Sequence, residues 1–155
     1  MVRYKMSFAD GVALYGKYVG NWGGAATRWR FDAKNGDTVV KSVTLCPSHR
    51  LHLEVTPSAT VLQEGDTYDM AGVRVRILDE NGSPAVYAQL PLTFAVTGAA
   101  VLVGPAAATA EGGMGGTYLR TVGQTGTAAL TVSAPQCAPV TVEFTVKKKE
   151  CAVWN

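Results

Sequence analysis

The sequence predicts an all-β protein built around an immunoglobulin-like β-sandwich. The 155-residue chain contains 20 valines and 16 threonines, and such branched side chains suit extended strands. Seventeen glycines and seven prolines supply frequent turns. From residue 50 onward, apolar and polar side chains alternate, which is typical of strands with one buried face. We therefore predict about seven short strands across residues 49–148.

The chain begins with a segment that predicts one short helix. Asp10 is placed to cap it, and Val12, Tyr15 and Val19 follow at positions i, i+3 and i+7 of one face. Gly20 is the expected end of this helix.

A β-hairpin is predicted next. Trp29 and Phe31 alternate with polar residues, Asn35-Gly36 is a hairpin turn signal, and residues 37–45 form the return strand. So few strands are marginally stable alone. We therefore expect residues 1–48 to be a small, partly β-rich unit, the trailing part of an upstream linker or accessory domain, joined to the sandwich through residues 46–50.

The sandwich strands follow from alternation between turn signals. The alternating apolar positions are Leu51, Leu53 and Val55; Val73, Val75 and Ile77; Leu92, Phe94 and Val96; Leu130 and Val132; Val140, Val142, Phe144 and Val146. The turn signals are residues 63–66, 79–82, 97–98, 123–126 and 134–135. Central positions of these runs predict that Val75, Phe94, Val132 and Val142 face the core. Residues 149–155 are expected to be a C-terminal tail.

The charge pattern argues against several classes of partner. The chain has 14 basic and 12 acidic residues, a net charge of +2, and its basic residues are scattered, so no nucleic-acid partner is predicted. The only basic run, Lys147–Lys149, is expected to be a solvated end beyond the last strand. No apolar stretch is long enough to span a membrane. Charged residues interrupt the first ten positions, so no secretory signal is predicted, although a piece of a longer protein need not carry one; the compartment stays open.

No cofactor or metal site is predicted. The glycine run Gly112–Gly116 lacks the Lys-Ser/Thr that follows in a phosphate loop, and we interpret it as a turn where backbones approach closely. His49 and His52 would point to opposite faces of a strand, and nothing completes a metal set. The three cysteines form no disulfide framework; they are Cys46, Cys137 and Cys151.

Two acidic loops carry the remaining candidates for chemistry. They contain Glu64, Asp66 and Asp69, and Asp79, Glu80 and Asn81. Paired carboxylates can hydrolyse a glycoside, but only when they face one sugar site; neither loop has the ligand spacing of a calcium loop. Loop carboxylates beside glycine usually accept backbone hydrogen bonds, so we predict turn-forming roles and no catalytic residue.

Aromatic residues gather near the start of the chain. They are Tyr15, Tyr18, Trp22 and Trp29. Exposed aromatic rings can stack on sugars, but beside a domain edge they more often belong to a core or an interdomain contact, which is the interpretation we favour.

Several short segments of the sequence resemble one protein family. They are Glu64–Asp69, Val73–Ile77, Asp79–Gly82, Phe94–Gly98, Val103–Pro105, Gly112–Tyr118 and Arg120-Thr121. Across roughly residues 50–147 this pattern resembles the C-terminal accessory domains of glycoside hydrolase family 2, the β-galactosidase-like enzymes. The first 48 residues are similar to the end of the linker domain that precedes such modules.

The resemblance implies a non-catalytic immunoglobulin-like domain of a bacterial glycosidase. In that family the catalytic glutamates belong to an upstream barrel, so no catalytic residue is carried over to this chain. The parent would hydrolyse β-linked sugars, and the partners would be other domains of the same polypeptide, with carbohydrate as a further possibility. Two alternatives stay open: an invasin-like bacterial adhesin domain, and a carbohydrate-binding module.

Overall fold

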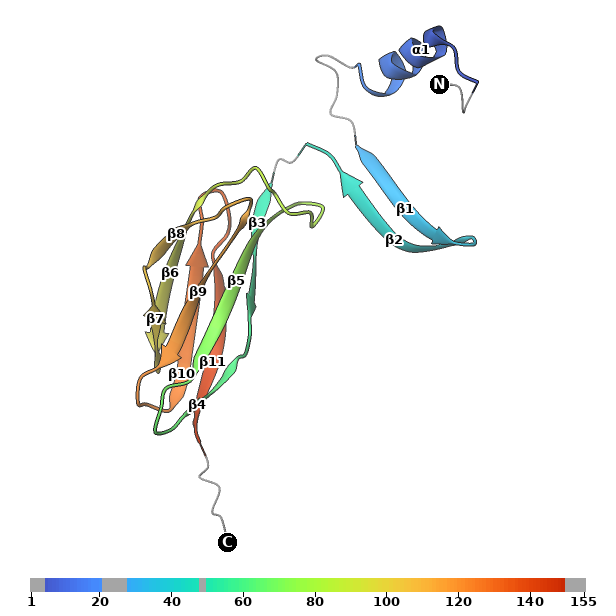
Figure 1. Cartoon of the computed structure of the whole chain (residues 1–155). Coiled ribbons are helices and arrows are strands. Elements are labelled where there is room, and N and C mark those ends of the chain that lie inside the picture. The colour runs from blue at the N-terminus through green and yellow to red at the C-terminus, as the bar shows by residue number, and fades with distance from the viewer. Residues whose placement is uncertain (1–4, 21–27, 48–49, 150–155) are drawn as a thin grey trace. The chain divides into compact units, whose positions relative to one another are not determined.

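The computed structural model describes residues 5–20, 28–47 and 50–149 (Figure 1). The chain divides into two compact units, Met1–Pro47 and Ser48–Asn155, and each is described by itself. Trp22, His49 and Cys151, which the sequence analysis singled out, lie outside the described residues.

The first unit opens with helix α1, Phe8–Tyr18. The prediction that Asp10 caps this helix is wrong by one turn. Ser7 is the N-cap, and its hydroxyl accepts a hydrogen bond from the Asp10 amide, while the Asp10 carboxylate accepts from the Ser7 amide. This reciprocal capping box satisfies two amides that have no partner inside the helix. At the other end, the Gly20 amide donates to the carbonyl of Tyr15.

The hairpin consists of β1, Trp29–Asn35, and β2, Thr38–Leu45. Its turn lies one residue later than the sequence predicts, because Asn35 pairs with Thr38 and the loop is Gly36 and Asp37. Only Gly36 adopts a positive φ, of 59°, as expected when glycine takes the first central position of a two-residue turn. A register shift between Ala33 and Lys34 accompanies this change.

The second unit is a β-sandwich of two sheets, which confirms the predicted fold class (Figure 1). The strands of the first sheet, in spatial order, are β4 (Val61–Glu64), β11 (Val140–Lys148), β10 (Gly126–Ser133), β6 (Pro91–Gly98) and β8 (Ala107–Thr109). Those of the second are β3 (Leu51–Pro57), β5 (Met70–Asp79), β9 (Met114–Thr121) and β7 (Ala100–Val103). Neighbouring strands are antiparallel except β4 and β11, which run parallel.

The core lies between the two sheets. Val75, Phe94 and Val132 are buried there as predicted, whereas Val142 is only partly buried and packs at the margin. Further along β11, Phe144 and Val146 provide the fully buried side chains instead. The alternation of the sequence therefore identified the inward face of every predicted strand, but not how far each strand reaches over the core.

The structure extends the last strand beyond its predicted end. Lys147 and Lys148 belong to β11 and pair with Gln63 and Glu64 of β4, and the Lys149 amide donates to the Glu64 carbonyl over 2.7 Å. The lysines remain exposed. The prediction that the run follows the last strand is wrong for Lys147 and Lys148 and holds for Lys149, which comes directly after β11. The parallel partner β4 supplies backbone acceptors and donors that the sequence pattern does not reveal.

Candidate functional site

The first acidic loop is built into the framework of the sandwich. Glu64 accepts hydrogen bonds from the Thr121 hydroxyl and, over 2.8 Å, from the Gly123 amide, and these bonds lower the pKa of its carboxyl. Asp69 accepts from the Gln63 amide over 2.9 Å, and its own amide donates to the hydroxyl of buried Thr121. The Glu64 carboxylate thus ties β4 to the end of β9, and Asp69 links β4 through its carboxylate and the end of β9 through its amide.

The second acidic loop is a side-chain-stabilised turn. Asp79 is only 7% exposed, and one of its carboxylate oxygens accepts hydrogen bonds from the amides of Asn81 and Ser83 over 2.8 and 2.9 Å. Gly82 follows with a φ of 77°. This is the turn-forming role predicted for a carboxylate ahead of glycine.

The described residues bring together no group of three or more His, Cys, Asp or Glu side chains that could hold a metal ion. His52 is exposed on β3, and the position of His49 lies outside the described residues. Cys137 is partly buried, and this burial raises the pKa of its thiol.

The glycine run serves backbone packing in two ways. Gly112 and Gly113 form a turn with positive φ, and a Cβ on Gly113 would lie 2.5 Å from the Ala85 carbonyl oxygen. Gly115 and Gly116 belong to strand β9, where added Cβ atoms would meet Leu92 at 2.6 Å and the Val73 carbonyl oxygen at 2.5 Å. The predicted close approach is present, but half of the run is strand rather than turn.

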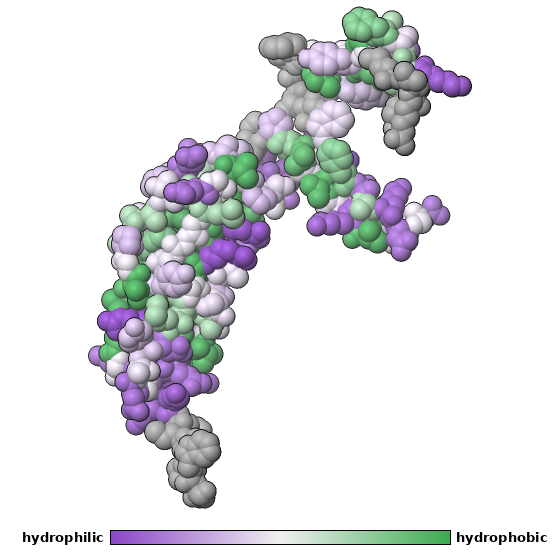
Figure 2. Space-filling model, viewed as in Figure 1, coloured by the Kyte–Doolittle hydropathy of each residue, from purple (hydrophilic) through white to green (hydrophobic). Residues whose placement is uncertain are grey.

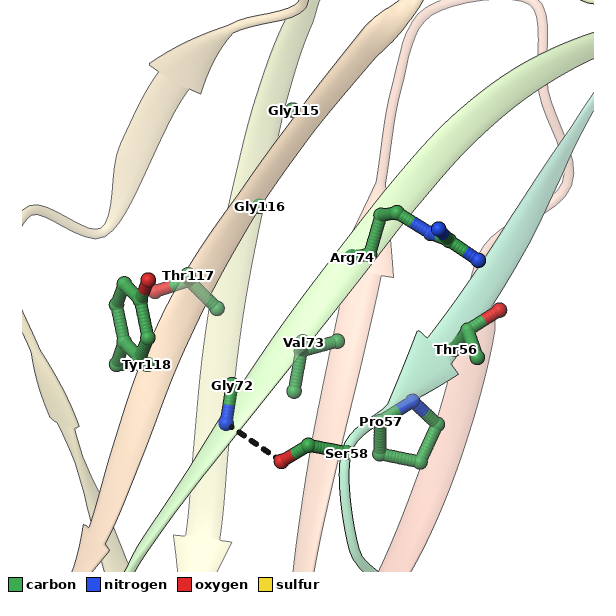
Figure 3. Close-up of a pocket in the computed structure, with 10 residues that line it drawn as sticks. All are labelled: Thr56, Pro57, Ser58, Gly72, Val73, Arg74, Gly115, Gly116, Thr117 and Tyr118. Atoms are coloured by element: carbon green, nitrogen blue, oxygen red, sulfur yellow. Dashed lines mark hydrogen bonds between the residues drawn. The ribbon is translucent and has the colours of Figure 1, made fainter.

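An open hollow lies on the outer surface of the sheet formed by β3, β5 and β9 (Figure 3). Its volume is about 440 Å³, within the range of small-molecule sites. The lining residues are Thr56, Pro57 and Ser58 from β3 and its end, Gly72, Val73 and Arg74 from β5, and Gly115, Gly116, Thr117 and Tyr118 from β9. No local sequence pattern predicts this site, because its lining comes from three separate strands.

The pairing register of β5 and β9 explains why this surface is hollow. Gly72 pairs with Tyr118, and Arg74 pairs with Gly116, so each of these two large outward side chains stands opposite a glycine. The Tyr118 ring leans over Gly72, with its Cε1 atom 3.2 Å from the position of a Cβ there. Tyr118 and Arg74 therefore stand on either side of bare backbone (Figure 3).

Arginines dominate the charge of this outer surface. Arg76 forms a forked ion pair with Glu54 over 2.7 and 2.8 Å, and its hydrogen bonds lower the pKa of Glu54. The Arg120 guanidinium lies 5.3 Å from the centre of the Tyr68 ring and donates to the Thr121 carbonyl. In the view of Figure 2, hydrophilic and hydrophobic residues are interspersed over the sandwich.

The aromatic residues of the first unit form a separate surface. On the hairpin, Trp29 pairs with Leu45 and Phe31 with Val43, which gives one apolar face whose side chains are 41–56% exposed. The rings of Tyr18 and Trp29 lie 6.4 Å apart. None of the helix residues is buried, so most of this apolar surface is accessible within the described residues.

These features define a class: an immunoglobulin-like sandwich module whose acidic loops are structural and whose outer sheet surface carries arginine and tyrosine. The family described as "glycoside hydrolase family 2 C-terminal domain 5" matches residues 53–143. The chain therefore belongs to this family, as the resemblance of its sequence phrases indicated.

Solved structures share the fold. A glycosyl hydrolase family 2 member from Bacteroides cellulosilyticus is 16% identical, with a TM-score of 0.62, and the match covers 80% of this chain and 18% of that chain. A β-glycosidase from Bacteroides vulgatus gives a TM-score of 0.63 at 16% identity, covering 79% and 18%. A family 2 β-glucuronidase gives 0.60 at 17%, covering 81% and 14%.

This chain thus corresponds to less than a fifth of the length of these similar proteins. No curated protein sequence matches it significantly. Within the described residues, no helix has the length and apolar character needed to cross a membrane.

Proposed function

We propose that this chain is a non-catalytic accessory domain of a bacterial, β-galactosidase-like glycoside hydrolase of family 2, which packs on or positions the catalytic body. The observation that carries the proposal is the family match over residues 53–143, which spans both sheets of the sandwich. Similar glycosidase chains are several times longer, which leaves room for a catalytic domain elsewhere in the polypeptide.

The hydrogen bonds and ion pair of the acidic side chains support a non-catalytic role. Glycoside hydrolysis needs two carboxyl groups that face one sugar site. Glu54 is engaged by Arg76, Glu64 and Asp69 by backbone and hydroxyl groups, and Asp79 by its own turn. These carboxylates stabilise the sandwich, and each would have to leave a hydrogen-bonded position to act on substrate.

The first unit supports attachment to a larger body. We propose that residues 1–48 are the trailing part of an upstream linker or accessory domain, with the sandwich in residues 49–148 and a tail in 149–155. A two-stranded hairpin is marginally stable in water, and this one exposes an apolar face containing Trp29, Phe31 and Leu45. Further strands of the same polypeptide would bury that face.

The test is a comparison of the parent polypeptide with a variant from which residues 50–149 are deleted. We expect turnover of a small aryl β-glycoside to persist, because the reacting groups lie elsewhere. We also expect the catalytic body to melt at a lower temperature, because its contacts with the sandwich are lost. The packing role is refuted if the catalytic body melts at the same temperature in both proteins and the sandwich of the parent unfolds in a separate transition.

A further inference from the structure

We propose that the hollow over Gly72 and Gly116 binds one anionic sugar unit of a polysaccharide, with Tyr118 against the sugar ring and Arg74 on its carboxylate or sulfate group. This site goes beyond the proposed accessory role. Ligand titration tests the binding role and the melting temperature of the parent tests the packing role, so either can fail without the other.

The shape of the site follows from two glycines in adjacent strands. Cross-strand partners alternate in size: Tyr118 stands opposite Gly72, and Arg74 stands opposite Gly116. A side chain at Gly116 would strike the Val73 carbonyl oxygen, with its Cβ at 2.5 Å, so the floor stays bare. The hollow of about 440 Å³ is open to solvent, so a saccharide unit seated there could belong to a longer chain.

The tyrosine provides a flat apolar wall. Tyr118 is 58% exposed, and its ring extends over Gly72, where an added Cβ would lie 3.2 Å from its Cε1 atom. An aromatic ring with an accessible surface and a polar tip is suited to contact the C–H groups of a pyranose ring. Thr56 and Ser58 border the opposite side (Figure 3) and bring hydroxyl groups to the site.

The charge distribution favours an anion. Residues 50–149 contain seven basic and eight acidic side chains, so this unit is slightly acidic as a whole. Three of its four arginines nevertheless project from the outer surface of one sheet: Arg74 and Arg76 on β5 and Arg120 on β9. The only carboxylate among their outward cross-strand partners is Glu54, so the surface is locally positive.

Of these arginines, Arg74 is the one that can receive a ligand. Arg76 is engaged by Glu54 in a forked ion pair, and Arg120 is held by a carbonyl group and the Tyr68 ring. Arg74 lines the hollow, and among the described residues its guanidinium group makes no hydrogen bond or ion pair. Glu54 attracts it only through space, because the carboxylate is already bonded to Arg76. A guanidinium group offers a planar fork of donors that matches a carboxylate or sulfate group.

The experiment titrates the full chain with three saccharide probes of equal length, and binding is measured by calorimetry and by amide NMR shifts. The probes are a trisaccharide of galacturonic acid, a sulfated galactose trisaccharide and neutral cellotriose. We expect the anionic probes to bind at least about tenfold more tightly than cellotriose, with shifts at Gly72, Gly116 and Tyr118. The carboxylated and sulfated probes reveal which anionic group is preferred.

Variants locate the site. Arg74→Gln should reduce affinity for the anionic probes about tenfold and abolish their advantage over cellotriose, and Tyr118→Ala should weaken all three. Tyr87→Ala is the matched control, because Tyr87 is 64% exposed but does not line the hollow; affinity should be unchanged. Equal binding of neutral and anionic probes, insensitivity of their affinities to Arg74→Gln, or amide shifts confined to residues outside the hollow would each overturn the proposal.

Discussion

Truncation of Phe94 to alanine tests whether the two sheets share one core. Phe94 is 4% exposed, lies opposite Val132 in the register of β6 and β10, and faces the second sheet. A buried phenylalanine removes about 150–250 Å² from water, which at ~25 cal/mol per Å² corresponds to about 4–6 kcal/mol. The alanine methyl retains part of this, and a residual cavity adds a cost, so we expect a loss of about 3–5 kcal/mol.

Such a loss is a large share of the stability of a small domain, about 5–15 kcal/mol. Thermal melts followed by circular dichroism should therefore show Phe94→Ala unfolding at least about 15 °C below the parent, or failing to fold. The matched control is Thr93→Ala on the outward side of the same strand. Thr93 is exposed and makes one long hydrogen bond, 3.4 Å, to the Ser133 carbonyl, so its loss should cost about 0.5 kcal/mol or less. Equal damage from both substitutions would refute the register and the sandwich argument.

Three further predictions concern the backbone, the acidic loop and the division of the chain. Gly98→Ala should lower the free energy of unfolding by about 2–5 kcal/mol, because the φ of Gly98 is 84° and a Cβ would overlap the Thr127 carbonyl oxygen. Gly82→Ala should cost only about 1–2 kcal/mol, because Gly82 has a φ of 77° but lies in open space. Denaturant titrations compare the two losses, and the reverse order would contradict the geometry. Hydrogen bonds hold the pKa of Glu64 low in the folded state. The stabilisation that the Glu64 carboxylate provides should therefore be present above about pH 4.5 and be lost as the pH falls through the lowered pKa. The difference in melting temperature between the unsubstituted chain and Glu64→Gln should shrink from pH 7 to pH 3, whereas a constant difference would contradict this role. Limited trypsin treatment should cut near Arg50 and leave a resistant fragment of about 100 residues, and an earlier cut within residues 70–98 would contradict the separate sandwich.

Alternation predicted those strands whose inward side chains are large. Along β5, Val73, Val75 and Ile77 are all buried, and the period of two is visible without any structure. Along β9, the inward positions are Gly115, Thr117, Leu119 and Thr121. Small and polar residues at these inward positions obscure the alternation, so the sequence predicts a glycine turn over Gly112–Gly116, where the structure already begins β9 at Met114.

The short edge strands were missed for a different reason. β8 consists of Ala107–Thr109, and three small residues carry no periodicity. β4, Val61–Glu64, is recognisable only through its parallel pairing with β11, a contact between residues more than 80 positions apart. Such pairings are set by the tertiary arrangement, which a local pattern does not contain.

The structural role of the acidic loops could be predicted, but their partners could not. Asp79 sits ahead of glycine, and its hydrogen bonds stay within the turn. Glu64 and Asp69 instead meet Thr121 and Gly123, which lie more than 50 residues later. The hollow beside Arg74 could likewise not be predicted from the sequence, because the pairing of Arg74 with Gly116 depends on the register of β5 and β9.

The most direct test of the central claim is an assay of glycoside hydrolysis by the isolated chain and by its parent polypeptide under the same conditions. The substrates are chromogenic β-galactoside, β-glucoside and β-glucuronide. We predict turnover of at least one substrate by the parent and no turnover by the isolated chain, since Glu54, Glu64, Asp69 and Asp79 are engaged in structural hydrogen bonds. Turnover by the isolated chain that disappears when Glu54, Glu64 or Asp69 is replaced by its amide would contradict the accessory role, as would a parent with no glycosidase activity.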